Sequence, residues 1–180
     1  MSQTMSSNLV ISALGKDRPG IVNELSQCIL DAGGNIADSR MSVLGGDFAV
    51  ILLVSGNWNS VAKIESQLPQ LADTLNMTIT SRRTERRPVR HDLLPYGIDV
   101  VALDHPGIVH HLASFFSARG INIQGMDTST YSAAHTGTPM FNVHMTVEIP
   151  SRLHIATLRE DFMEFCDQLN LDGVMEPIKG

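Results

Sequence analysis

The sequence predicts an α+β protein made of two tandem ferredoxin-like units, each with the element order βαββαβ. Two observations carry this prediction. A segment recurs along the chain at a fixed offset, and both copies show the same succession of strand-like and helix-like segments. Each unit is expected to form an antiparallel sheet with both helices on one face. The predicted units are residues 8–82 and 96–178, joined by a linker over residues 83–95.

The repeat is clearest at Asp17-Arg-Pro-Gly-Ile-Val22, which recurs 87 residues later as Asp104-His-Pro-Gly-Ile-Val109. One such match can arise by chance, but a register kept over about twenty residues indicates a duplicated unit. The same offset relates three further pairs: Leu25 and Leu112, Gly33 and Gly120, and Asn35-Ile36 and Asn122-Ile123.

The first strand of each unit is expected over the alternating segments 8–14 and 97–103. A helix follows in both units, opened by Pro19 or Pro106, because the first helical turn does not need the N–H that proline lacks. Apolar residues then recur at the spacing of one helical face. The two helices are expected to end at Gly33 and Gly120, since glycine commonly takes a left-handed conformation just past a helix.

A hairpin comes next in both units. Gly45-Gly46 is a strong signal for a two-residue turn between strands 36–44 and 48–54. In the second unit the connection over residues 132–139 is longer, and its outgoing strand alternates apolar and polar residues. The second helices are expected over 60–73 and 154–169, and the last strands over 77–81 and 173–178.

The strand over residues 48–54 is apolar at nearly every position. Such a run is typical of a strand buried on both faces. We therefore expect the open face or edge of the first unit to pack against the other unit or against another subunit.

Composition and charge exclude several classes of protein. Of 180 residues, 43% are hydrophobic and 18% charged, which argues against disorder. The net charge of −6 argues against binding nucleic acid through the whole surface. The polar start has no signal-peptide pattern and no apolar run approaches about 20 residues, so a cytoplasmic location is expected. Cys28 and Cys166 are interpreted as buried, reduced thiols.

Motifs for catalysis, cofactors and metals are absent from the sequence, so neither an enzyme nor a cofactor is predicted. Asp17 and Asp104 are interpreted as helix caps rather than as a catalytic pair. His105, His110 and His111 lie close together, but adjacent helical residues point about 100° apart. With no further ligands evident, no metal site is predicted.

A βαββαβ unit with Asp-x-Pro-Gly-Ile at its first turn and Asn-Ile opening its second strand resembles an ACT domain, a small amino-acid-sensing module. Two such units in tandem resemble the family of glycine cleavage system transcriptional repressors. The resemblance implies a protein that senses an amino acid, glycine, and represses by binding a LysR-type activator protein rather than DNA. An amino-acid-responsive subunit acting on a metabolic enzyme in trans stays open, as does a homodimer.

The turn offers a chemical reason for ligand binding. A helix start presents free N–H groups and the positive end of the helix dipole, which suit a carboxylate. In ACT families the effector commonly sits between this turn and the second strand, at the interface of two units. The alternative is that the turn only builds a helix start, and His105 in place of Arg18 leaves open whether both turns bind the same ligand. The candidate ligand-binding residues are Asp17, Arg18, Pro19, Gly20, Ile21, Asn35 and Ile36, with Asp104, His105, Pro106, Gly107, Ile108, Asn122 and Ile123.

Five arginines lie between the two units, at positions 82, 83, 86, 87 and 90. The run is interpreted as a linker or a domain-docking segment. Contact with an acidic partner or with nucleic acid stays open.

Overall fold

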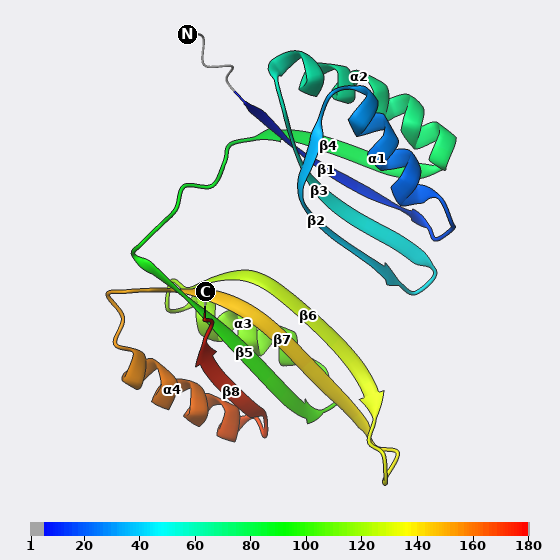
Figure 1. Ribbon diagram of the computed structural model, residues 1–180. Coiled ribbons are helices and arrows are strands. Elements are labelled where there is room, and N and C mark those ends of the chain that lie inside the picture. Colours follow the sequence, from blue (N-terminus) through cyan, green and yellow to red (C-terminus); the bar gives the residue numbers. More distant parts are fainter. Residues whose placement is uncertain (1–5, 180) are drawn as a thin grey trace. The chain divides into compact units, whose positions relative to one another are not determined.

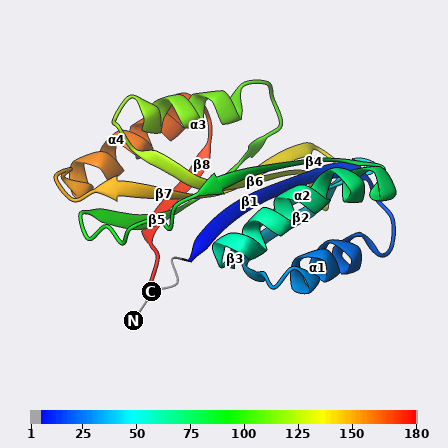
Figure 2. The ribbon, with the colours of Figure 1, turned by 90° about the horizontal axis from the view of Figure 1, so that it is seen from above.

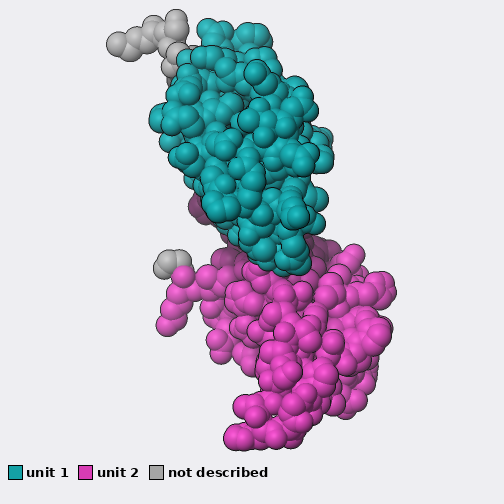
Figure 3. Space-filling view, turned by 90° about the vertical axis from the view of Figure 1, so that its right-hand side faces the viewer, with its two compact units in different colours: residues 1–88 teal, residues 89–180 magenta. Residues whose placement is uncertain are grey.

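A computed structural model of the protein describes residues 6–179 and divides the chain into two compact units between Pro88 and Val89 (Figure 3). This division lies inside the segment predicted as the linker. The elements of the first unit are β1 Ser7–Lys16, α1 Ile21–Asp31, β2 Asn35–Leu44, β3 Asp47–Gly56, α2 Trp58–Leu75 and β4 Met77–Thr84. Those of the second unit are β5 Leu93–Leu103, α3 Ile108–Ser117, β6 Asn122–Ser132, β7 Pro139–Pro150, α4 Ile155–Gln168 and β8 Asp172–Pro177.

The predicted fold class is confirmed in both units. The two four-stranded sheets have the orders β2-β3-β1-β4 and β6-β7-β5-β8, and every pairing is antiparallel. In each unit both helices lie on the same face of the sheet (Figures 1 and 2). The strands extend further than the sequence pattern indicates: β4 reaches Thr84 and β5 begins at Leu93, because both continue to pair with a neighbouring strand.

The two units bury different kinds of core. In the first, alternate residues of β1 and β3 pack under α1 and α2, and the core is almost wholly aliphatic. In the second, Phe115, Phe116 and Phe162 fill the space between α3, α4 and the sheet. Each core cluster draws its residues from one unit.

The start of each first helix differs from the prediction. The helices begin at Ile21 and Ile108, and the N-cap residues are Gly20 and Gly107, both with φ of 94°. The prolines therefore stand before the cap rather than in the first helical turn. The helix-capping role predicted for Asp17 and Asp104 is also wrong, because neither helix has a side-chain cap hydrogen bond. Glycine replaces them because the left-handed conformation at the cap penalises a Cβ atom.

The helix ends and hairpins follow their predicted residues. Gly33 and Gly120 have φ of 82° and 67° just past α1 and α3. Leu44 pairs with Asp47 across the turn, where Gly45 has φ of 62°. A positive φ at the first central residue alone is the pattern of a type II′ turn.

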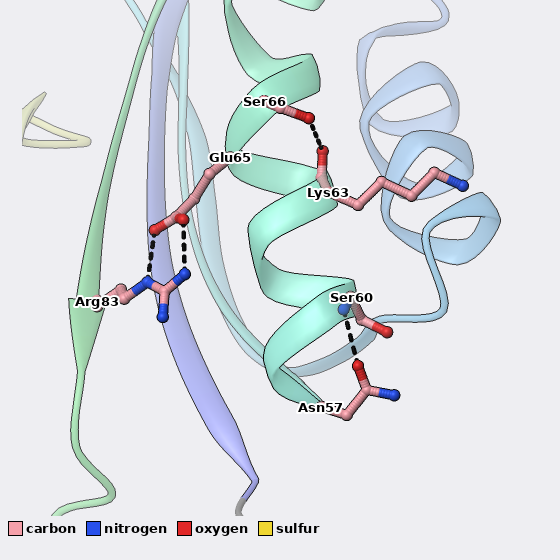
Figure 4. Close-up of polar contacts among 6 residues, drawn as sticks. All are labelled: Asn57, Ser60, Lys63, Glu65, Ser66 and Arg83. Carbon is pink, nitrogen blue, oxygen red and sulfur yellow. Dashed lines mark hydrogen bonds and ion pairs between the residues drawn. The ribbon is translucent and has the colours of Figure 1, made fainter.

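The second helix of the first unit begins at a side-chain cap. The side-chain oxygen of Asn57 accepts the backbone N–H of Ser60 at 2.8 Å (Figure 4). At the other end the helix stops at Asn76, which has φ of 51°. These two asparagines explain why α2 spans Trp58–Leu75, longer at both ends than the apolar spacing predicts.

The open face of β3 is not buried as its apolar run predicts. Phe48, Val50, Leu52 and Val54 are buried beneath the helices, but Ile51 on the other face is 53% exposed. Packing of this face or of the sheet edge against the other unit or against another subunit stays a prediction.

Candidate functional site

The turn between β1 and α1 presents backbone donors at the start of a helix. The N–H of Glu24 donates to the carbonyl of Gly20 at 2.9 Å, which is the first helical hydrogen bond. The N–H groups of residues 21–23 consequently have no acceptor within the helix. The helix dipole adds a partial positive charge at the same place, so the turn is suited to an anion such as a carboxylate.

An ion pair frames this turn. The Nη1 atom of Arg18 lies 3.6 Å from Oε1 of Glu24 and 3.3 Å from the carbonyl oxygen of Pro19. A Cβ atom placed on Gly20 would lie 3.7 Å from the same Glu24 oxygen and 3.9 Å from Arg18 Nη1. A cation, a carboxylate and unpaired N–H groups therefore surround the open side of Gly20. This set of charges matches the two ends of a free amino acid.

The second unit builds the same turn with different side chains. Gly107 repeats the backbone of Gly20, and the N–H of His111 donates to its carbonyl at 2.9 Å. His105 hydrogen-bonds the carbonyl of Pro106 through Nδ1 at 3.1 Å, while Nε2 of His111 would lie 3.4 Å from a Cβ on Gly107. Two imidazoles thus occupy the places of the ion pair in the first unit.

Sequence reasoning missed Glu24 and His111 as members of these turns. The signal was available, because the offset of 87 relates Glu24 to His111 as well as Arg18 to His105. The ion pair of Arg18 and Glu24 in the first unit is therefore replaced as a pair, by His105 and His111, in the second unit. In contrast, Ile21 and Ile108 are buried core residues, so only their backbone atoms can reach a ligand.

Each turn lies far along the sheet from the Asn-Ile segment of its own unit. In the first unit the turn follows Lys16, whereas Asn35 is level with Asn8, because both pair with Ser55. Asn8 and Lys16 are eight residues apart along β1, or about 26 Å at about 3.3 Å per residue.

The second unit repeats this separation. Asn122 is level with Pro95, because both pair with Glu148, while the turn follows Leu103. Within one unit, neither turn can therefore form a small site together with its Asn-Ile segment.

Two residues of the arginine run over positions 82–90 are engaged with carboxylates. Arg83 lies in β4 and donates to both carboxylate oxygens of Glu65 at 2.9 Å (Figure 4). Its guanidinium carbon stands 5.3 Å from the ring centre of Trp58. These hydrogen bonds from Arg83 lower the pKa of the Glu65 carboxyl. Arg90 pairs in the same way with Asp92. Their charges are thus compensated locally.

The cysteines and histidines form no obvious reactive group. Burial raises the pKa of the Cys166 thiol to about 11, and burial also raises the pKa of Cys28, which is only half-buried. Within residues 6–179, no three His, Cys, Asp or Glu side chains are arranged to hold a metal ion. None of the helices in that range is long and apolar enough to cross a membrane.

Two βαββαβ units with glycine-capped turns define a protein built from two ferredoxin-like domains in tandem. The family model described as an ACT domain matches residues 7–81. The "Glycine cleavage system transcriptional repressor" of Escherichia coli (strain K12) is 34% identical over 165 residues, which are 92% of this chain and 87% of the relative. The chain therefore belongs to the family of glycine cleavage system transcriptional repressors.

Solved structures agree with this assignment. The crystal structure of a putative glycine cleavage system transcriptional repressor is 27% identical, with a TM-score of 0.73 over 98% of this chain and 99% of the other. An unknown protein from Galdieria sulphuraria is 29% identical, with a TM-score of 0.78 over 97% and 99% of the two chains. Kinship with a transcriptional repressor supports a regulatory role.

Proposed function

We propose that this protein represses glycine cleavage genes in response to glycine bound at its glycine-capped turns. The observation that carries the proposal is the environment of Gly20. Unpaired helix N–H groups, the guanidinium of Arg18 and the carboxylate of Glu24 meet around Gly20, which has no side chain of its own. The kinship with a glycine cleavage repressor supports glycine as the effector.

Glycine is a carboxylate and an ammonium joined by one carbon. Its carboxylate would accept from the helix N–H groups and Arg18, and its ammonium would donate to Glu24. Because Asn35 is at the other end of the sheet, it would contact this ligand only if a second molecule brought its β2 to the turn. A glycine-bound homodimer is therefore part of the proposal.

Repression would act through an activator protein of the LysR type rather than through DNA. The chain carries a net charge of −6, and Arg83 and Arg90 already pair with carboxylates. A phosphate-binding surface needs free cations in excess. The repressor would bind the activator when glycine is scarce.

Glycine must then favour the free form over the activator-bound form, because a ligand shifts an equilibrium only through its differential affinity. A coupling of about 1–3 kcal/mol would weaken activator binding roughly 5- to 150-fold.

The effector is tested by thermal denaturation with and without glycine. Millimolar glycine should raise the melting temperature, since a ligand bound only to the native state stabilises it. Glu24→Gln should reduce the rise by weakening the ammonium contact, whereas Glu85→Gln, outside the turns, should leave it unchanged. If glycine never alters the melting of the parent protein, glycine is not the effector.

The partner is tested separately. Activator affinity is measured with and without saturating glycine, beside a gel shift with the repressor alone. Tight sequence-specific DNA binding by the repressor alone, or an activator affinity that glycine does not change, would contradict the mechanism. Capture of a metabolic enzyme whose activity responds to glycine would favour the alternative of a regulatory subunit acting in trans.

A further inference from the structure

A groove of about 500 Å³ runs between α3 and α4 on the helical side of the second unit. Its wall begins at His111, beside the turn glycine Gly107, and continues to Arg119 at the end of α3. Ligand pockets in proteins occupy about 300–1,000 Å³. The groove is thus far larger than glycine requires, and His111 is the residue it shares with the turn.

The floor of the groove is aromatic. The rings of Phe115 and Phe165 lie with their centres 4.8 Å apart, and both contact Phe162 beneath them. Phe115 is nearly buried, whereas Phe165 is only partly covered and faces the groove. Such a floor offers a flat surface on which another ring can stack.

Arg119 is held in place above this floor. Its Nη1 donates to the carbonyl oxygen of Phe115 at 2.9 Å, and its guanidinium stands 3.8 Å from the centre of the Phe115 ring. The Nη2 atom lies 3.7 Å from Oδ2 of Asp161, which is too long for a hydrogen bond. Arg119 therefore keeps donors for a carboxylate while its orientation is already fixed.

Two carboxylates face the same groove. Asp161 lies beside Arg119, and one oxygen of Glu164 accepts from Gln168 at 3.3 Å, which leaves the other oxygen for a ligand. The lining thus presents one permanent cation and two carboxylates. A ligand with both a carboxylate and an ammonium would satisfy this arrangement better than an anion alone.

The first unit lacks the equivalent of this groove's central groups. The offset of 87 places Ala32 at the position of Arg119 and Cys28 at that of Phe115. In the first unit, side chains instead make contacts between α1 and α2. Lys63 points toward α1 (Figure 4), where its Nζ donates to the carbonyl of Asp31 at 3.3 Å. The Sγ atom of Cys28 lies 3.6 Å from Oε1 of Gln67. The arrangement therefore belongs to the second unit.

We propose that the groove between α3 and α4 binds a free α-amino acid with an aromatic side chain. The carboxylate of this ligand pairs with Arg119, its ammonium with Glu164 and Asp161, and its ring stacks on Phe165. These four residues lie outside the turns, so the proposal stands whether or not the turns bind glycine.

The test is a titration of the full-length ¹⁵N-labelled protein, followed by NMR. L-Phenylalanine is compared with 3-phenylpropionate, which lacks the ammonium, and with phenethylamine, which lacks the carboxylate. We expect saturable shifts of amides in α3 and α4, with L-phenylalanine binding at least tenfold more tightly than either analogue. Equal binding of the three compounds, shifts spread over the whole surface, or no shifts at 10 mM would overturn the proposal.

Single substitutions test which charged side chains of the groove bind the ligand. Arg119→Met and Glu164→Gln should each weaken L-phenylalanine binding at least fivefold. Arg159 is an exposed cation of α4 that does not line the groove. Arg159→Met should therefore leave the binding of L-phenylalanine unchanged. If Arg119→Met unfolds the second unit, Glu164→Gln still tests the site, because Glu164 is exposed. An equal loss in Arg159→Met, or none in Glu164→Gln, would contradict the site.

The two ligands are also distinguished. Glycine should shift amides near Gly20 or Gly107 without displacing L-phenylalanine. If glycine competes with L-phenylalanine for the amides of α3 and α4, the two ligands share one site, and the proposal of a separate groove site is overturned.

Discussion

At the scale of single residues, the two glycine caps have a backbone conformation that L side chains rarely adopt. Gly20 and Gly107 share φ of 94°, and the nearest atoms to a Cβ at Gly20 are no closer than 3.7 Å. The constraint at Gly20 is therefore conformational rather than steric. Without a close neighbour to clash with, an added methyl group affects the backbone and the open side of the turn, but not the core.

Gly20→Ala should lower the free energy of unfolding by about 1–2 kcal/mol, the usual cost of a left-handed conformation for an L-residue. It should also diminish the stabilisation by glycine. Urea denaturation with and without glycine measures both effects. Gly46→Ala is the matched control, since that residue has no positive φ and no atom within 4 Å of its Cβ position. Equal losses in both variants would argue against a special role for Gly20.

The cysteines give a second prediction at this scale. With a pKa of about 11, only about 0.1% of Cys166 is thiolate at pH 8. In the unfolded chain the pKa of the thiol is near 9, so the thiolate fraction at pH 8 is roughly a hundredfold larger. Ellman's reagent should therefore modify Cys28 before Cys166 in the native protein, and both rapidly in denaturant. A native Cys166 that reacts as fast as it does unfolded would contradict this.

At the scale of elements, the cap of α2 is one measurable contribution. Asn57→Ala removes the acceptor for the Ser60 N–H, and should lower the free energy of unfolding by about 1 kcal/mol. Asn57→Asp keeps an acceptor and should retain most of the stability. Chemical denaturation compares the two, and an equal loss in both would show that the cap oxygen is unimportant.

Strand β8 packs closely on α4 through a glycine. A Cβ at Gly173 would lie 2.6 Å from Sγ of Cys166 and 3.1 Å from two ring carbons of Phe162. Gly173→Ala should therefore cost about 1–3 kcal/mol through overpacking. Adding Cys166→Ala should recover part of this loss, as a double-mutant cycle would detect. Gly125→Ala, with no atom within 4 Å, should be near neutral.

The elements also show where sequence reasoning succeeds. The offset repeat and the apolar periodicity predicted both units and all four helices, because these patterns record which faces are buried. They did not predict that Gly20 caps the helix, since Pro19 and Gly20 each suit a helix start and only the backbone angles distinguish them. The separation of Asn35 from the turn follows from strand pairing, which a single sequence does not state.

At the scale of the whole molecule, two independent cores divide the stability. Phe162→Ala should destabilise the second unit by about 3–5 kcal/mol, and Ile64→Ala the first by about 2–5 kcal/mol, because both side chains are fully buried. Hydrogen exchange should show that each substitution lowers protection mainly within its own unit. A uniform loss across residues 6–179 would instead indicate that the units unfold together.

The central place of β1 in its sheet has a consequence for synthesis. Strand β1 pairs with β3 and β4, so the first strand made needs the last strand of its unit, which ends at Thr84. At about 5–20 residues per second, β1 waits roughly 3 to 14 seconds on the ribosome for that partner. The first unit can then close before its duplicate has emerged. Translation order thereby limits the exchange of equivalent strands between two units that share one topology.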